Sequence, residues 1–307
     1  MKQKILLVLM IVISVAAFYL LFNQLNKISK NGTTVKLPDK TQLKIAATFF
    51  PIYDIAKNIL GDKGEIVQIL PQGASPHTYE PNIQDIQKLS DTKLIFMIGL
   101  GIDNWALEVA NQSQEKITVV DMSQYMTLLL PATAPDEGGT YDPHYWLSID
   151  NAGLIAANVA AALAKVDPAN TNYYESNLLQ YLQKLMATLD QAKQKIQLLQ
   201  NRQIITFHNA FNYFAQELDL EIVATIEPFP GKEPTASYLA EIGEIINQYD
   251  IKVLFKEPQL SDVVVTALAN DYGATVYTLD PEGALPEITT FIELYEYNVD
   301  SIVSALK

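Results

Sequence analysis

The longest uninterrupted helical pattern in the chain, from Ala169 to about Gln200, constrains its fold more than any other feature. Apolar side chains recur there at intervals of three, four or seven residues, with Gln and Lys between them, and no Gly or Pro interrupts the stretch. At about 1.5 Å per residue, such a helix would run roughly 45 Å, enough to cross a pair of domains. The pattern therefore predicts one long helix between two separately folded halves.

Short apolar runs alternate with amphipathic stretches on both sides of this expected helix. We expect buried strands at 44–49, 65–70, 93–98, 116–120, 203–206, 221–226, 251–255 and 275–279. Helical patterns lie between the runs, and the last one before the long helix extends from Ile149 to Ala164. Strands that alternate with helices form parallel sheets. The sequence therefore predicts an α/β fold of two lobes, each with a parallel-type βα sheet, joined by one long rigid backbone helix.

The start of the chain has the pattern of a membrane segment. Lys2 and Lys4 precede an uncharged, largely apolar run from Ile5 to Phe22, which is long enough to span a bilayer core. A signal peptidase could cut after the small residues Ser14 and Ala16, but the apolar run continues past them, so we expect an uncleaved anchor. The basic residues place the rest of the chain outside the cytoplasmic membrane, anchored to it or, after cleavage, secreted to the periplasm or exterior.

These patterns divide the chain into five segments. We expect a signal or transmembrane anchor at 1–22, a tether at 23–42, an N-terminal α/β lobe at 43–165, the linking backbone helix at 166–201 and a C-terminal α/β lobe at 202–307. The formal net charge of −14 argues against a nucleic-acid partner, whose phosphates require a basic face. The absence of cysteine excludes disulfides, thiolate zinc sites and lipid attachment. We expect a monomer that contacts the membrane through its N-terminal helix.

Three histidines are all that the chain has, and each falls next to a predicted strand or helix. His77 follows the second predicted strand, His208 directly follows the fifth, and His144 lies in the loop before a predicted helix. Asp280 directly follows the last predicted strand. In open α/β sheets, ligands bind at the carboxyl ends of the strands. Three neutral imidazoles and one carboxylate form a tetrahedral ligand set for zinc, so we expect a shared metal site.

Each of these residues also has a simpler interpretation. A single loop histidine is usually solvated or hydrogen-bonded, and Asp280, which precedes a proline, could cap a turn. Asp142 could orient His144, although turn formation is the more common role. Glu80 and Glu233, each before a proline, could be ligands, although loop stabilisation is the more common role. The joint occurrence at strand ends favours the metal site, because no local pair such as His-Glu-x-x-His is present.

Several segments, in the same order, resemble the substrate-binding proteins of zinc and manganese ABC importers. They are PHTYEP at 76–81, GLGIDNW at 99–105, DPHYWL at 142–147, HNAFNYF at 208–214, GKEPT at 231–235, KEPQ at 256–259 and LDP at 279–281. The similarity extends from about Leu43 to Lys307. It implies a metal bound between two α/β lobes that a rigid helix bridges, with the ligand positions of the family at His77, His144, His208 and Asp280.

The resemblance also implies which ion is carried. In the family, histidine at the third ligand position accompanies zinc and glutamate accompanies manganese, and residue 208 is His. Manganese prefers oxygen ligands and higher coordination, which agrees with this assignment. The implied function is an extracytoplasmic receptor that captures Zn²⁺ and delivers it to an ABC permease, without catalytic residues or a cofactor. The alternatives are a manganese-specific member, a zinc hydrolase with Asp280 as general base, and a surface adhesin whose metal is structural.

Overall fold

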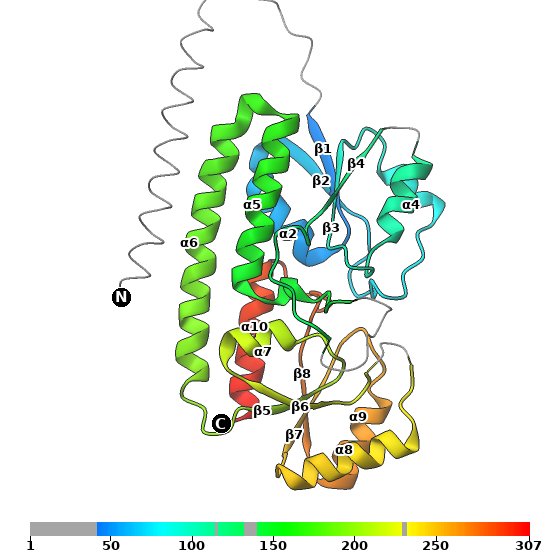
Figure 1. Cartoon of the computed structure of the whole chain (residues 1–307), viewed down its shortest axis with the longest axis vertical. Helices are drawn as coiled ribbons and strands as arrows, with labels where there is room; N and C mark the ends of the chain where they lie inside the picture. The colour runs from blue at the N-terminus through cyan, green and yellow to red at the C-terminus, as the bar shows by residue number, and fades with distance from the viewer. Residues whose placement is uncertain (1–41, 114–115, 132–139, 229–231) are drawn as a thin grey trace, which may run out of the picture. The chain divides into compact units, whose positions relative to one another are not determined.

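In the computed structural model, parallel strands form the sheet of the N-terminal lobe (Figure 1). β1 (Leu43–Ala47) pairs with β2 (Gly64–Gln68) on one side and with β3 (Leu94–Met97) on the other, and β3 pairs with β4 (Thr118–Asp121). All four residues of β3 are buried, as expected for a central strand of a parallel sheet. The predicted strands of this lobe and their parallel arrangement are confirmed.

The C-terminal lobe repeats this strand order. β5 (Gln203–Thr206) pairs in parallel with β6 (Glu221–Thr225), and β7 (Val253–Lys256) pairs in parallel with β8 (Thr275–Thr278). These pairs are two separate two-stranded sheets, and because β5 contacts β7 they lie side by side in the order β6, β5, β7, β8. The N-terminal lobe has the order β2, β1, β3, β4. The carboxyl ends of the strands in each lobe therefore lead into loops at one edge, where the predicted ligands lie.

Helices connect the strands in both lobes. The N-terminal lobe contains α2 (Phe50–Leu60), η1 (Gly61–Lys63), α3 (Ile83–Lys88), α4 (Trp105–Gln112), η2 (Tyr145–Leu147) and α5 (Ile149–Val166). The C-terminal lobe contains α7 (Asn212–Leu218), α8 (Ala236–Gln248), α9 (Val263–Tyr272) and α10 (Phe291–Ala305). Between them lie the short turn η3 (Pro168–Asn170) and the long helix α6 (Thr171–Ile196).

The long helix α6 contacts elements of both lobes. It packs against α2 and α5 in the N-terminal lobe and against α7 and α10 in the C-terminal lobe (Figure 1). It is shorter than predicted, because Pro168 begins a 3₁₀ turn and the helix proper starts at Thr171. At its other end the chain tightens through the hydrogen bond from Leu199 N to Ile196 O before it enters β5. The prediction of one linking helix is confirmed.

 

The observed helix thus spans Thr171–Ile196, where the sequence predicts a helix from Ala169 to about Gln200. Its buried side chains form one face, with Tyr174, Tyr181 and Leu185 among them, as the apolar periodicity predicts. The difference lies only at the ends, where local turns replace the last residues of the pattern.

The structure describes residues 42–113, 116–131, 140–228 and 232–307. The predicted anchor at 1–22 and all but the last residue of the predicted tether at 23–42 lie outside them. Within the described residues, only α5 is long and apolar enough to cross a membrane. Half of that stretch is buried in the protein, where it packs against α2 and α6, so α5 is a core helix.

The last helix, α10, joins parts of the chain that are far apart in sequence. It packs against α6 and against α2 of the N-terminal lobe. The Asp54 carboxylate on α2 accepts a hydrogen bond from the backbone N–H of Phe291, the first residue of α10, at 2.9 Å. Burial raises the pKa of Asp54, although this hydrogen bond opposes the shift.

The predicted lobe boundaries at 43–165, 166–201 and 202–307 remain predictions.

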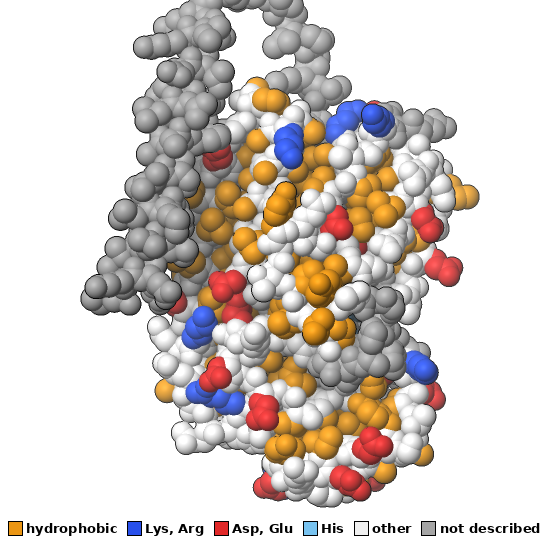
Figure 2. All heavy atoms as spheres, viewed as in Figure 1, with side chains coloured by type: hydrophobic (Ala, Val, Ile, Leu, Met, Phe, Trp, Pro, Cys, Tyr) orange, Lys and Arg blue, Asp and Glu red, His pale blue; other side chains and the backbone are white. Residues whose placement is uncertain are grey.

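The apolar interior is divided into two clusters. The larger one extends through the N-terminal lobe, α5, α6 and α10, and the smaller one lies in the C-terminal lobe between β5, β7, α8 and α9. On the face shown in Figure 2, acidic side chains are scattered among polar and apolar ones. The negative charge of the chain is therefore not gathered into one patch on that face.

Candidate metal centre

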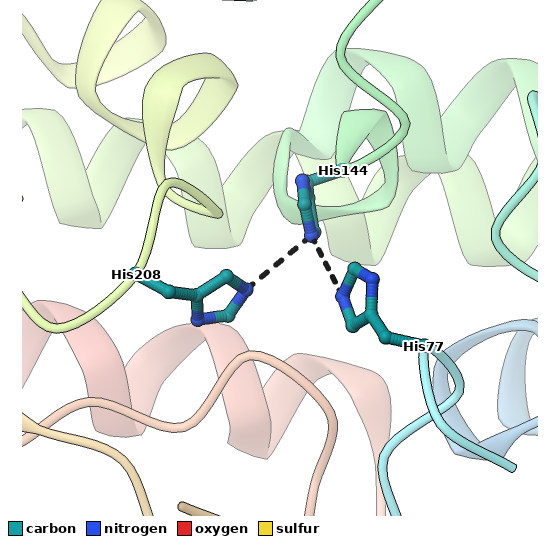
Figure 3. Close-up of side chains that lie close together, drawn as sticks. All are labelled: His77, His144 and His208. Atoms are coloured by element: carbon teal, nitrogen blue, oxygen red, sulfur yellow. Dashed lines mark hydrogen bonds between the residues drawn. The ribbon is translucent and has the colours of Figure 1, made fainter. Parts of the chain in front are cut away.

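The three histidines converge on one point, although they come from three separate loops (Figure 3). His77 lies between β2 and α3, His144 directly precedes η2, and His208 follows β5. The Nε2 atom of His144 is 3.2 Å from Nε2 of His77 and 3.4 Å from Nε2 of His208. The structure therefore brings together the three imidazoles that the sequence singles out.

The spacing of the nitrogens suits a small ion. Bonds of 2.0–2.1 Å to a tetrahedral ion place two ligand nitrogens about 3.3–3.4 Å apart. The two Nε2 separations of 3.2 and 3.4 Å are close to this tetrahedral edge. His144 and His208 are buried and His77 is half-buried. The cluster could therefore hold a divalent cation with little rearrangement of the side chains.

Carboxylates fix the protonation of two of these rings. Nδ1 of His144 lies 2.8 Å from Asp142 Oδ1, and Nδ1 of His208 lies 2.6 Å from Glu257 Oε2. An ionised carboxylate only accepts hydrogen bonds, so each Nδ1 carries the proton and each neutral ring presents a lone pair at Nε2. The lone pairs of His144 and His208 then face each other at 3.4 Å. This arrangement favours a cation between them.

Asp142 has both of the roles that the sequence left open. Its Oδ1 accepts the backbone N–H of His144 at 2.9 Å, which closes a turn, and also contacts the ring nitrogen Nδ1. Burial acts to raise the pKa of Asp142, but the hydrogen bond from the His144 ring, together with those from Asn212 and the backbone N–H of His144, outweighs it, and the pKa is lowered. Asp142 is therefore an ionised carboxylate that both shapes the loop and orients the ring.

Glu257 has the corresponding role for His208, and no role was assigned to it from the sequence. The side chain is buried at the end of β7, where it also accepts the backbone N–H of His208 at 3.1 Å and Nε2 of Gln259 at 2.9 Å. The sequence does contain a signal for Glu257, because this residue follows a predicted strand just as His208 and Asp280 do. The rule that ligands bind at the carboxyl ends of strands therefore applies to Glu257 as well.

Asp280 is fully buried and caps a turn. Its carboxylate accepts the backbone N–H groups of Glu282, Gly283 and Leu285 at 2.8–3.0 Å. Gly283 has a φ of +74°, and a Cβ there would lie 2.1 Å from the ring of Phe50, so the turn requires glycine. The turn-capping interpretation is thus observed. The role of Asp280 as a metal ligand remains a prediction.

The acidic residues near the cluster differ in their surroundings. Within the described residues, one group of potential ligands is close enough together to hold a metal ion. It consists of the three histidines, whose ligand atoms all lie within 4.8 Å of one another. Glu80 and Glu233, which the sequence offered as alternative ligands, are exposed and do not belong to it. Glu282 is buried, and its Oε2 has no hydrogen-bond partner among the described residues. Burial raises the pKa of Glu282 well above its usual value, and the nearby carboxylates of Glu257 and Asp280 raise it further.

Trp146 connects the loop of His144 to the loop of Asp280. Its ring is fully buried, lies 5.1 Å from the ring of His144 and meets the ring of Phe49 edge-on at 5.0 Å. Its Nε1 donates a hydrogen bond to the carbonyl of Pro281 at 2.8 Å. The loop after β8 is therefore fixed against the N-terminal lobe beside the histidines.

The fold and this cluster define the class of the protein as a metal-binding substrate-binding protein of ABC transporters. A family model described as "Zinc-uptake complex component A periplasmic" matches residues 45–305. The chain belongs to this family, the ZnuA family. The family resemblance and the α/β fold predicted from the sequence are thereby confirmed.

Relatives of the chain are named for two different metals. The high-affinity zinc uptake system protein ZnuA of Bacillus subtilis (strain 168) is 28% identical over 95% of this chain and 96% of its own length. The manganese-binding lipoprotein MntA of Halalkalibacterium halodurans is also 28% identical, over 87% and 90%. A solved structure of a ZnuA deletion mutant with zinc bound has a TM-score of 0.78 and 28% identity, and the match covers 86% of this chain and 98% of that one. Family membership alone therefore does not select the ion.

Proposed function

We propose that the chain is an extracytoplasmic receptor that captures Zn²⁺ at His77, His144 and His208 and delivers it to an ABC permease, without catalysing a reaction. The observation that carries the proposal is the convergence of three Nε2 atoms at 3.2 and 3.4 Å, with carboxylates at Nδ1 of two rings. Asp280 is retained as the fourth ligand. The hydrogen bond from Trp146 to Pro281, which holds its loop against the segment of His144, supports this choice.

The nitrogen-rich cluster supports zinc as the cargo. Zinc accepts a tetrahedral set of imidazole and carboxylate ligands, whereas manganese prefers oxygen ligands in a six-coordinate arrangement. Manganese is the second candidate. The buried carboxylate of Glu282, in the same loop as Asp280, would offer a further oxygen ligand, and a relative is named as manganese-binding.

Competition between the two ions tests the proposal. The full chain, purified in mild detergent and stripped of metal, is titrated with Zn²⁺ and Mn²⁺ in the presence of a chromophoric chelator. We expect wild-type protein to bind zinc more tightly, and His208→Glu to shift the preference toward manganese because a carboxylate replaces an imidazole. His208→Ala is the matched control, since it removes a ligand without adding an oxygen.

Two results would count against this function. Equal or tighter binding of Mn²⁺ by the wild-type chain would overturn the choice of zinc. Unchanged zinc affinity in both His77→Ala and His144→Ala would overturn the site itself.

In cells, we expect His144→Ala to abolish zinc uptake that depends on this protein, and removal of residues 1–22 to release the protein from the membrane fraction.

A further inference from the structure

The short helix α7 lies at the junction of the two segments that contain His144 and His208. It begins at Asn212, four residues after His208, and its side chains reach the segment of the N-terminal lobe that contains His144. Its polar contacts with that segment come from three residues, Asn212, Tyr213 and Glu217. The groups that these three residues contact lie on both sides of His144 in the sequence.

Two of these contacts hold the segment just before His144. Nδ2 of Asn212 donates to Asp142 Oδ2 at 2.9 Å and to Asn209 Oδ1 at 2.9 Å. The hydroxyl of Tyr213 donates to the carbonyl of Asp142 at 2.9 Å. Because Asp142 contacts Nδ1 of His144, the orientation of this ring depends on a helix of the opposite lobe.

The third contact holds the segment just after His144. Oε1 of Glu217 accepts hydrogen bonds from Ser148 Oγ at 2.8 Å and Asp150 N at 2.9 Å, and Oε2 accepts one from Ile149 N at 2.9 Å. These groups form the first turn of α5, where unpaired backbone N–H groups favour a negative charge. Oε2 also accepts the hydroxyl of Tyr295 on α10 at 2.7 Å, which fixes the carboxylate from a second side.

We propose that α7 sets the separation between His144 and His208 before any metal is bound. Glu217 and Tyr213 are then positioning residues for metal capture. This inference rests on the proposed function, because it assumes that the histidines are the ligands. Its consequence is that two of the three imidazoles are placed in advance, so the ion does not have to draw the lobes together.

Two variants test α7 without altering a histidine. Glu217→Gln keeps the shape of the side chain but removes its charge from the first turn of α5. Tyr213→Phe keeps the ring but removes the hydroxyl that also accepts the backbone N–H of Leu129 at 2.8 Å. In the full chain in mild detergent, we expect each change to weaken zinc binding about tenfold, as loss of an outer-shell partner does.

A spectroscopic measurement separates positioning from folding. Co²⁺, bound in place of zinc, absorbs visible light strongly in a tetrahedral site and weakly in a six-coordinate one. We expect the absorption of Co²⁺ to weaken in Glu217→Gln and Tyr213→Phe, because a displaced His144 changes the coordination geometry. A purely structural role would lower the free energy of unfolding of the metal-free chain and leave this spectrum unchanged.

Glu293→Gln is the matched control. Glu293 caps the first turn of α10, where it accepts hydrogen bonds from the backbone N–H groups of Thr289 and Thr290 at 2.9 and 3.0 Å. It is therefore also a helix-capping glutamate, but one that holds no segment carrying a histidine. We expect Glu293→Gln to destabilise the metal-free chain while zinc affinity and the Co²⁺ spectrum stay at wild-type values.

The outcomes are distinguishable. Wild-type zinc affinity and Co²⁺ spectra in both Glu217→Gln and Tyr213→Phe would overturn the role of α7 and leave the receptor function intact. If one of the two variants fails to fold, wild-type zinc affinity and a wild-type Co²⁺ spectrum in the remaining variant would be enough to overturn the role of α7. A wild-type chain that binds neither zinc nor manganese would overturn the receptor function together with this inference.

Discussion

Carboxylates behind the imidazoles decide which ring nitrogen is available to an ion. Asp142 and Glu257 each accept a hydrogen bond from Nδ1, which leaves Nε2 of His144 and His208 unprotonated in the neutral ring. An amide in place of the carboxylate would bind the ring without the negative charge that strengthens its donation to the metal. The acidic partners are therefore part of the proposed site.

We expect Glu257→Gln to lower zinc affinity by roughly 10- to 100-fold, the usual effect of removing such a partner. A competition titration of the stripped chain against a chelator measures the change. Glu221→Gln is a suitable control, because Glu221 is an exposed strand residue whose carboxylate accepts a hydrogen bond from Gln203. Equal affinities in Glu257→Gln and wild type would contradict the assigned role.

Asp103, in the turn before α4, is another buried carboxylate with a measurable effect. It accepts hydrogen bonds from Thr48 Oγ1 and from the backbone N–H groups of Ile98 and Gly99 at 2.7–2.8 Å. Burial nevertheless raises the pKa of Asp103 to about 6 from 3.8. The folded chain therefore binds a proton that the unfolded chain has released between about pH 4 and 6.

This difference predicts how stability depends on pH. Because the pKa is raised in the folded state, the contribution of Asp103 to the free energy of unfolding falls as pH rises from about 4 to 6, by about 3 kcal/mol in all. Urea denaturation of wild type and Asp103→Asn across this range measures it. We expect the variant to lack this decline and the exposed control Asp91→Asn to retain it. Parallel profiles for wild type and Asp103→Asn would contradict the assignment.

Among the helices, α6 links the lobes through one buried face. Leu185 is 1% exposed, whereas its neighbour Met186 is 65% exposed. We expect Leu185→Ala to lower the free energy of unfolding by about 2–5 kcal/mol, because it leaves a cavity in the core. Met186→Ala should change it by no more than about 0.5 kcal/mol. Chemical denaturation of the metal-free chain compares them, and similar losses would show that the buried face is wrongly assigned.

Elements are also where the sequence was most informative. Each predicted strand is present. Strands could be predicted because the alternation of apolar and amphipathic stretches is a local pattern that can be read from consecutive residues. The ends of α6 were less predictable, because Pro168 starts a 3₁₀ turn rather than the helix itself. The short helix α7 carries no strong periodic signal of its own. Its importance arises from contacts with Asp142 and the start of α5, which are distant in sequence.

Taken as a whole, the described molecule has several connections that oppose a large movement of its lobes. α6 contacts both lobes, α10 packs against α2, and α7 holds the segment of His144. We expect zinc binding to move Cα atoms by about 1 Å or less. Small-angle scattering of the stripped and zinc-loaded chain, with His144→Ala as a non-binding control, measures this. A clear decrease in the radius of gyration on adding zinc to wild type alone would contradict it.

The sequence by itself determined the α/β class, the linking helix and the three histidines at strand and helix ends, because these features depend on composition and on local periodicity. Only the tertiary structure decided which atoms meet. Glu257 reaches His208 across 49 residues, and Asn212 reaches Asp142 across 70. Such pairs form only when distant segments pack together, and no local pattern records them. The orientation of the imidazoles, and hence the geometry offered to the ion, follows from that packing.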